Sequence, residues 1–151
     1  MRITLLLVGK TQKGWILDGL DEYRNRLGHY INFEIKELPA LKVKVDLKQK
    51  QGEMILKSLR PDDRVILLDE HGDTFSSVQW ARNIEGLMQS GRNIVYVVGG
   101  AFGFSEDVYA RADGMISLSR MTFSHQMVRV IFAEQLYRAF TIINGEPYHH
   151  E

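Results

Sequence analysis

The chain has 151 residues, of which 44% are hydrophobic and 25% are charged, as in an ordinary globular domain. Its 19 basic and 19 acidic residues give a net charge of zero, which argues against a general polyanion binder. It contains no cysteine, which excludes disulfide scaffolds, zinc fingers, iron–sulfur motifs and thiol catalysis. We therefore expect one compact domain over residues 1–151 that is stabilised by an apolar core.

The apolar run at residues 3–8 lacks the basic region, long apolar core and small-residue cleavage site of a signal peptide. No window approaches the roughly 18 apolar residues of a membrane span. These observations predict a cytoplasmic protein that does not associate with a membrane.

Strand and helix patterns alternate along the first half of the chain. The apolar run at 3–8 predicts a strand, and apolar residues recur at helical spacing over 15–27. Residues 33–38 alternate apolar and charged side chains, as in a second strand. A lysine-rich loop at 42–46 then leads into a predicted helix over 47–59.

The alternation continues through the middle of the chain. Residues 65–68 form an apolar run typical of a strand covered on both faces, and a polar turn is expected at 69–73. Ser76 or Ser77 can cap a helix that ends at Gln89. Residues 94–98 predict another buried strand.

The last part adds two helices and one strand. Ser105 is expected to cap a short helix, and residues 115–118 predict the last strand. Ser124 opens a long amphipathic helix that runs to about Asn144. This strand–helix order predicts an α/β domain with a mostly parallel sheet and helices on both faces. Because ligands of such sheets lie beyond the carboxyl ends of the strands, the loops at 69–73, 99–104 and 119–124 are candidate binding segments.

Each of these loops allows two interpretations. The G-G-x-x-G pattern at 99–103 is neither a dinucleotide fingerprint nor a phosphate-binding P-loop, so it is either a tight turn or a ligand cradle. The titratable residues at 69–71 favour a solvated turn over a metal or acid–base site, since no further ligand stands at a suitable spacing. The hydroxyl-rich segment 118–125 can bind a polar ligand, cap the last helix, or do both.

The long last helix is apolar over much of its circumference, which indicates burial against the sheet and against a partner subunit. Arg129, Glu134 and Arg138 interrupt this surface, and by themselves they favour ordinary solvated or helix-paired charges. The tail ends with Tyr148 and His149, which belong either to a frayed terminus or to a site where a ring stacks on a base and an imidazole handles a proton or a phosphate.

Several motifs occur in one order along nearly the whole chain: LLLVGK at 5–10, YVVGG at 96–100 followed by Gly103, LSRMTF at 118–123 followed by His125, VRV at 128–130, EQLYRA at 134–139 and PYH at 147–149. In these motifs the chain resembles the RlmH-like family of SPOUT-class methyltransferases. That family methylates a pseudouridine in 23S ribosomal RNA. The resemblance implies an α/β knot in which the C-terminal segment forms a trefoil, although knots are almost absent from globular folds.

The resemblance also implies a homodimer that binds S-adenosylmethionine in the knot, without a metal ion. The positions of this chain that match the cofactor pocket are Leu68, Gly99, Gly100, Leu118, Ser119, Arg120, Met121, Thr122 and Phe123. All of them fall at or within the strand-end loops named above.

In such enzymes the methyl group goes to N3 of pseudouridine, within the assembled ribosome. Because N3 carries a proton, a general base or a polarising donor should assist the transfer. The candidate catalytic residues are His149, Tyr148 and Arg129, with Glu134 behind them. The tail is expected to complete the site of the partner subunit. Lysines at 42, 44, 48 and 50 are candidates for phosphate contacts.

Two other functions compete with this interpretation. A ribosome-binding protein could keep the fold and lack catalysis, and cofactor titration would distinguish it. A nucleotide-binding oxidoreductase is disfavoured, because the glycine spacing is wrong and no carboxylate ends a strand about 20 residues after Gly103.

Overall fold

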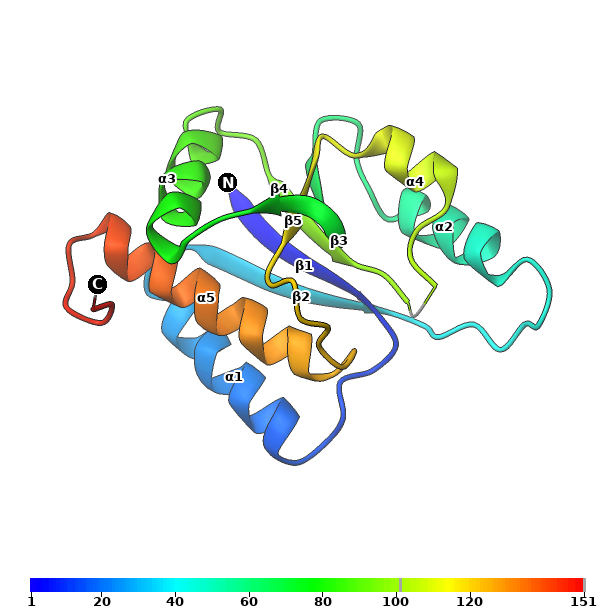
Figure 1. The fold of residues 1–151 in the computed structure, drawn as a ribbon, viewed down its shortest axis with the longest axis horizontal. Helices are drawn as coiled ribbons and strands as arrows, with labels where there is room; N and C mark the ends of the chain where they lie inside the picture. Colours follow the sequence, from blue (N-terminus) through cyan, green and yellow to red (C-terminus); the bar gives the residue numbers. More distant parts are fainter. Residues whose placement is uncertain (101, 151) are drawn as a thin grey trace.

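The computed structural model describes residues 1–100 and 102–150 (Figure 1). Ala101, inside the predicted glycine loop, and Glu151, at the end of the tail, lie outside the described residues. Strands and helices alternate along the described chain in the order β1 (Arg2–Val8), α1 (Trp15–Leu27), β2 (Asn32–Leu38), α2 (Leu47–Lys57), β3 (Arg64–Thr74), α3 (Ser77–Met88), β4 (Ile94–Val98), α4 (Glu106–Arg111), β5 (Gly114–Ser117) and α5 (Met127–Ile143).

The strands form one sheet in the order β2-β1-β4-β3-β5, and every neighbouring pair is parallel. The α/β fold class expected from the sequence is therefore confirmed. Parallel strands place all their carboxyl ends on one edge of the sheet. The loops that follow β1, β2 and β4 accordingly leave the sheet at the same end (Figure 1).

Helices cover both faces of the sheet. Along β1, Leu5 packs in one apolar cluster with Trp80 of α3 and Phe132 of α5, on the face that α1 also covers. Its neighbour Leu6 points the opposite way, into a cluster that includes Ile55 of α2. Strands buried on both faces explain why β1 and β4 are nearly continuous apolar runs in the sequence.

Serine caps start two of the helices where the sequence predicted them. The Ser76 side chain accepts a hydrogen bond from the Gln79 amide, and the Gln79 side chain accepts one from the Ser76 amide, which together form a capping box. The Ser105 hydroxyl accepts from the amide of Val108 in α4. Helix α5 begins three residues later than predicted, although the Ser124 hydroxyl still accepts from the Met127 amide at 3.0 Å.

The polar turn predicted at residues 69–73 is wrong, because this segment belongs to β3. The strand pairs with β5 on both sides of a register shift between Leu68 and Asp73. Gly72 allows this pairing, since a Cβ atom there would lie 2.6 Å from the backbone of Ile116. Polar side chains on the irregular end of a strand therefore resemble a turn in the sequence.

No helix in the described ranges is both long and apolar enough to cross a membrane.

Candidate active site

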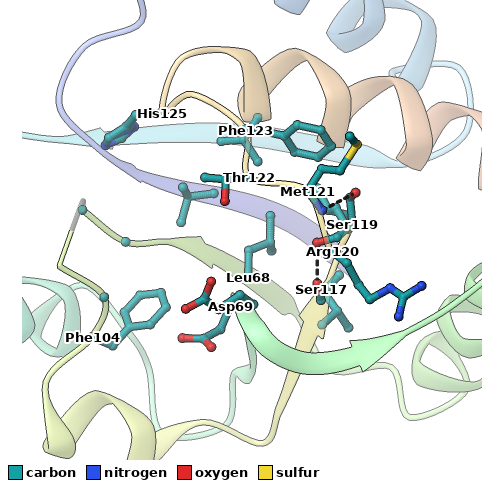
Figure 2. Close-up of a pocket in the computed structure, with 18 residues that line it drawn as sticks. Leu68, Asp69, Phe104, Ser117, Ser119, Arg120, Met121, Thr122, Phe123 and His125 are labelled. Carbon is teal, nitrogen blue, oxygen red and sulfur yellow. Dashed lines mark hydrogen bonds between the residues drawn. The ribbon is translucent and has the colours of Figure 1, made fainter.

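A cavity of about 470 Å³ lies beside the middle of β3 and at the ends of β4 and β5 (Figure 2). The structure brings together around it all nine residues that the sequence assigned to cofactor binding: Leu68, Gly99, Gly100, Leu118, Ser119, Arg120, Met121, Thr122 and Phe123. These residues come from three segments that are far apart in the sequence. They meet because parallel strands deliver their loops to one edge.

The glycine turn after β4 forms a wall of the cavity that is built from backbone. A Cβ atom on Gly99 would lie 2.9 Å from the ring of Phe104, and one on Gly100 would lie 3.0 Å from the Gln51 side chain. Gly103 has a φ of +79°, and its amide donates to the Gly100 carbonyl at 3.2 Å. The turn therefore brings the backbone next to the cavity without an intervening side chain.

The segment after β5 is shaped by its own serines (Figure 2). The Ser117 hydroxyl donates to the Ser119 carbonyl at 2.9 Å, and the Met121 amide donates to the Ser119 hydroxyl at 2.9 Å. The Met121 side chain is 79% exposed at this loop. Hydrogen bonds within the loop thus fix its course past the cavity.

Asp69 also lines the cavity, and the sequence analysis missed this role. Its carboxylate accepts hydrogen bonds from the Tyr109 hydroxyl and from the backbone and ring nitrogens of His71. Burial raises the pKa of Asp69, but these hydrogen bonds outweigh burial and leave the pKa below its ordinary value. The cavity therefore carries a fixed negative charge. Its position directly after a buried strand is the sequence signal that could have identified it.

On the opposite side of the cavity, His125 precedes α5 and Val128 lies in its first turn. Burial lowers the pKa of His125, and the nearby Arg129 guanidinium lowers it further. The imidazole is therefore neutral at neutral pH.

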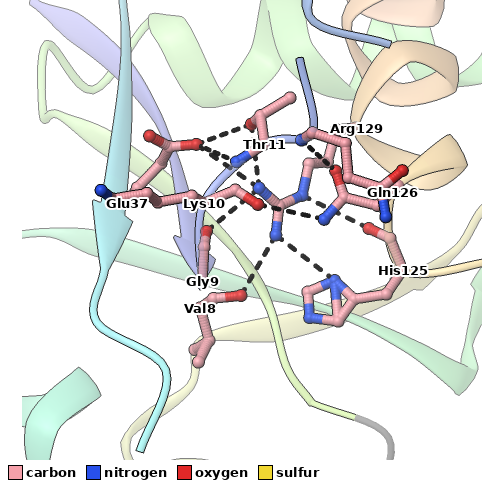
Figure 3. A network of polar contacts seen from close by, with 9 residues as sticks. Val8, Gly9, Lys10, Thr11, Glu37, His125, Gln126 and Arg129 are labelled. Atoms are coloured by element: carbon pink, nitrogen blue, oxygen red, sulfur yellow. Dashed lines mark hydrogen bonds and ion pairs between the residues drawn. The ribbon is translucent and has the colours of Figure 1, made fainter. Parts of the chain in front are cut away.

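Arg129 is completely buried and fastens α5 to the end of β1 (Figure 3). Its guanidinium donates to the carbonyl oxygens of Val8 and Gly9, both at 3.1 Å, and to the Thr11 hydroxyl at 2.9 Å. It also lies 3.5 Å from a carboxylate oxygen of Glu37. A fully buried guanidinium is not a solvated charge, and its donors are held by the end of β1 and by Thr11. A catalytic role for Arg129 stays a prediction.

The other three candidate catalytic residues, Glu134, Tyr148 and His149, form a second group together with Arg138, and we call these four residues the tail cluster. The Tyr148 hydroxyl donates to Glu134 at 2.8 Å, and Arg138 donates to Glu134 at 2.9 Å and to the Nδ1 atom of His149 at 3.0 Å. The predicted frayed terminus is thus packed on α5. Burial raises the pKa of Tyr148, and hydrogen bonds with Tyr23 and Glu134 raise it further, so the phenol stays protonated.

None of the tail cluster lines the cavity of the same chain. Val128 borders the cavity, whereas Glu134 lies six residues further along α5, about 9 Å along the helix axis. The candidate cofactor site and the candidate catalytic groups are therefore separate within one chain.

Among residues 1–100 and 102–150, no group of three or more His, Asp or Glu side chains could hold a metal ion.

Comparison with known proteins decides the family. A family model described as "predicted SPOUT methyltransferase" matches residues 1–149. This chain belongs to the SPOUT methyltransferase family. The match confirms the resemblance drawn from the motifs, and family membership implies the trefoil knot. The matched range, residues 1–149, includes every residue that lines the cavity and every residue of the tail cluster.

Individual SPOUT relatives match the chain over its full length. A protein of Parabacteroides distasonis named ribosomal RNA large subunit methyltransferase H is 51% identical, with 100% of both chains covered. A protein of Christiangramia forsetii with the same name is 50% identical over 99% of each chain. A solved structure from work on 2-OH methylation of C/U34 on tRNA is 13% identical, with a TM-score of 0.49 over 96% of this chain and 98% of that chain.

Proposed function

We propose that this SPOUT protein uses S-adenosylmethionine to methylate RNA of the large ribosomal subunit, in the cytoplasm. Its target is N3 of a pseudouridine in 23S rRNA on the assembled ribosome. The observation that carries the proposal is the convergence of all nine expected cofactor-binding residues on one cavity. Full-length relatives with about half of their residues identical, named for large-subunit rRNA methylation, support the substrate class.

The residues around the cavity fit the cofactor. The volume of about 470 Å³ lies in the range of small-molecule sites, roughly 300–1,000 Å³. The glycine turn lets a flat ring approach the backbone, and Asp69 supplies a negative charge that suits a sulfonium cation. When bound, the cofactor supplies an electrophilic methyl group whose departure from sulfur needs no metal ion.

The loops of the cavity act mainly by positioning. Methyl transfer requires the attacking nitrogen about 3 Å from the methyl carbon and in line with the departing sulfur. The backbone of the glycine turn and residues 118–123 hold one partner of this alignment, since both segments are fixed by internal hydrogen bonds. The neutral His125 borders the site without adding a competing positive charge.

The tail cluster provides hydrogen-bonding groups for the pseudouridine ring. Tyr148 keeps its proton and donates a hydrogen bond to Glu134, so it holds the tail in place and is not a general base. His149 accepts from Arg138 at Nδ1, which leaves Nε2 as the donor of the neutral ring. A donor aimed at a carbonyl oxygen that flanks N3 stabilises the negative charge that develops on the pseudouridine as the N3 proton passes to solvent water and the methyl group leaves sulfur for N3. Glu134 orients Tyr148 and Arg138.

The active protein is a homodimer in which the tail of one subunit meets the cavity of the other. This arrangement reconciles the separation of the two groups within one chain with the need for contact between them. A smaller pocket, lined by apolar residues such as Trp80 and Ile131 and by polar ones such as Ser77 and Gln135, shares Phe123 and Leu118 with the cavity. A second subunit seated on this pocket would bury it and reach the cavity edge.

Calorimetric titration with S-adenosylmethionine and its demethylated product, with NAD as the control ligand, tests the cofactor assignment. We expect saturable binding of both sulfur compounds and no heat with NAD. Methyl transfer to purified ribosomes, followed by nuclease digestion and mass spectrometry, tests the substrate and the modified atom. If neither compound binds in the absence or presence of ribosomes, the protein is a non-catalytic ribosome-binding member of the fold.

A further inference from the structure

Most of the positive charge of the lysines gathers on one part of the sheet edge. Six of the eight lysines lie in the loop at 9–15 after β1, or in the loop and first helical turn at 39–50 after β2, and all six are exposed: Lys10, Lys13, Lys42, Lys44, Lys48 and Lys50. We call residues 9–15 and 39–50 the basic edge. Asp46 is the only acidic residue within it. A chain of zero net charge therefore presents a strongly cationic surface here.

The basic edge also exposes a large aromatic ring. Trp15 follows Lys13 at the start of α1 and is 70% exposed, whereas the only other tryptophan, Trp80, is 4% exposed in the core. An indole in water has lost the burial that normally stabilises such a side chain. Lysines on the same sheet edge as an exposed aromatic ring match single-stranded RNA, whose phosphates pair with cations while its bases stack on rings.

Hydrogen bonds hold the loop after β1 to the end of β2. The Gly9 amide donates to the Leu38 carbonyl at 2.7 Å, and the backbone and hydroxyl of Thr11 donate to the Glu37 carboxylate at 2.5 and 2.6 Å. Burial raises the pKa of Glu37, but the hydrogen bonds from Thr11 and the nearby Arg129 lower it below its ordinary value. Because Glu37 stays ionised and keeps its hydrogen bonds with Thr11, the loop after β1 is fixed against β2.

The same loop is fixed to the wall of the cofactor cavity (Figure 3). The Gln126 side chain accepts from the Gln12 amide at 2.8 Å and donates to the Lys10 carbonyl at 3.1 Å. Gln126 follows His125, which lines the cavity, and β1 lies next to β4 in the sheet. The loop after β1 is thus joined to the segment that carries the cavity-lining His125, along the same edge of the sheet.

We propose that the basic edge is the docking surface for a single-stranded RNA segment next to the target nucleotide, with a base stacked on Trp15 and phosphates on the flanking lysines. This inference rests on the proposed function. It adds the position of the RNA strand on the protein and the aromatic ring on which a base stacks. The strand runs along the sheet edge from β2 toward the cavity at β4 and β3.

Tryptophan fluorescence tests the stacking directly and needs no methylation. Trp15 is exposed and Trp80 is buried, so a single-stranded oligouridine that stacks on Trp15 should quench the exposed component of the emission. We expect quenching by the oligouridine, little quenching by an RNA duplex or by polyphosphate, and loss of the effect in Trp15→Leu. Binding of the oligouridine without quenching, or equal quenching in Trp15→Leu, would overturn the proposal.

Charge reversal tests the phosphate contacts on the substrate itself. In Lys42→Glu/Lys44→Glu we expect the KM for ribosomes to rise by about tenfold or more and to depend less on salt concentration. The kcat and the affinity for the cofactor should stay near their values in the unchanged protein. Lys42→Arg/Lys44→Arg should restore the KM. Lys57→Glu is the matched control, because this exposed lysine ends α2 outside the basic edge.

The two proposals fail in different ways. If the unchanged protein transfers methyl groups to ribosomes and the charge reversals leave KM and its salt dependence unchanged, only the docking surface is wrong. If no transfer occurs, the proposed function fails, and the fluorescence titration still decides whether the basic edge binds single-stranded RNA.

Discussion

The guanidinium of Arg129 donates from Nη2 to the carbonyl oxygen of Val8 at 3.1 Å, which joins the first turn of α5 to the last residue of β1. The same side chain holds the Gly9 carbonyl and lies beside His125 at the cavity wall. One buried cation thus fixes the cavity wall and the basic edge relative to each other. Arg129 acts through its neighbours, as a positioning residue.

Replacing Arg129 should destabilise the protein strongly. Arg129→Met leaves buried carbonyl oxygens without donors, which costs about 1–3 kcal/mol for each unsatisfied group. We expect the free energy of unfolding, measured by urea denaturation at fixed protein concentration, to fall by roughly 3 kcal/mol. Arg82→Met is the control, since its pair with Glu85 is exposed and contributes less than about 1 kcal/mol. Equal effects in both variants would contradict the role of Arg129.

The glycine turn gives a prediction for cofactor binding. A side chain at Gly99 collides with the Phe104 ring, which is itself buried at the cavity wall. We expect Gly99→Val to weaken binding of the demethylated cofactor by about tenfold or more in calorimetry, by the loss of a well-packed contact surface. Gly86→Ala should leave binding unchanged, because a Cβ atom there meets nothing within 4 Å. If Gly99→Val binds the demethylated cofactor with unchanged affinity, the cofactor does not bind at the glycine turn.

Periodicity and strand-end rules predicted much of this fold. The helix over 15–27 and the strand over 94–98 have the predicted bounds, since a helical apolar period marks the first, a continuous apolar run marks the second, and a glycine follows each. The cavity could be predicted for the same reason, because parallel topology brings the end of the apolar run at 65–68 and the loops after β4 and β5 to one edge.

Features that depend on long-range contacts could not be predicted in this way. Residues 69–73 look like a turn, and only their pairing with β5 across a bulge makes them a strand. Arg129 looks like a surface charge until the ends of β1 and β2 are placed beside it. The packing of the tail on Glu134 and Arg138 likewise joins residues that have no common period.

His125 makes the stability of the fold depend on pH. Because burial and Arg129 hold its pKa below 6.5 in the folded protein, the unfolded chain binds more protons between that lowered value and pH 6.5. The free energy of unfolding should therefore rise as the pH increases through this window and level off above it. Denaturation curves at pH 5.0–7.5 measure this slope. His125→Gln should flatten it, and an unchanged slope would exclude His125 as its source.

Asp69 should discriminate between the charged and neutral forms of the cofactor. Its lowered pKa keeps it ionised at the cavity, where it attracts the sulfonium of S-adenosylmethionine but has no such partner in the neutral thioether product. We expect Asp69→Asn to weaken binding of S-adenosylmethionine about tenfold and binding of the product much less. The ratio of the two dissociation constants is the measurement. An equal loss for both would assign Asp69 a structural role only.

The separation of the tail cluster from the cavity predicts subunit complementation. Gly99→Arg should abolish cofactor binding and keep a functional tail, whereas His149→Ala should bind cofactor and lose most turnover on ribosomes. If the tail acts on the partner's cavity, a mixed dimer contains one cavity and one tail that are both intact. Co-refolding equal amounts of the two inactive variants should then restore about one quarter of the full activity, because half of the random dimers are mixed and each has one complete site. No recovery, with mixed dimers verified by mass spectrometry, would show that each tail serves its own chain.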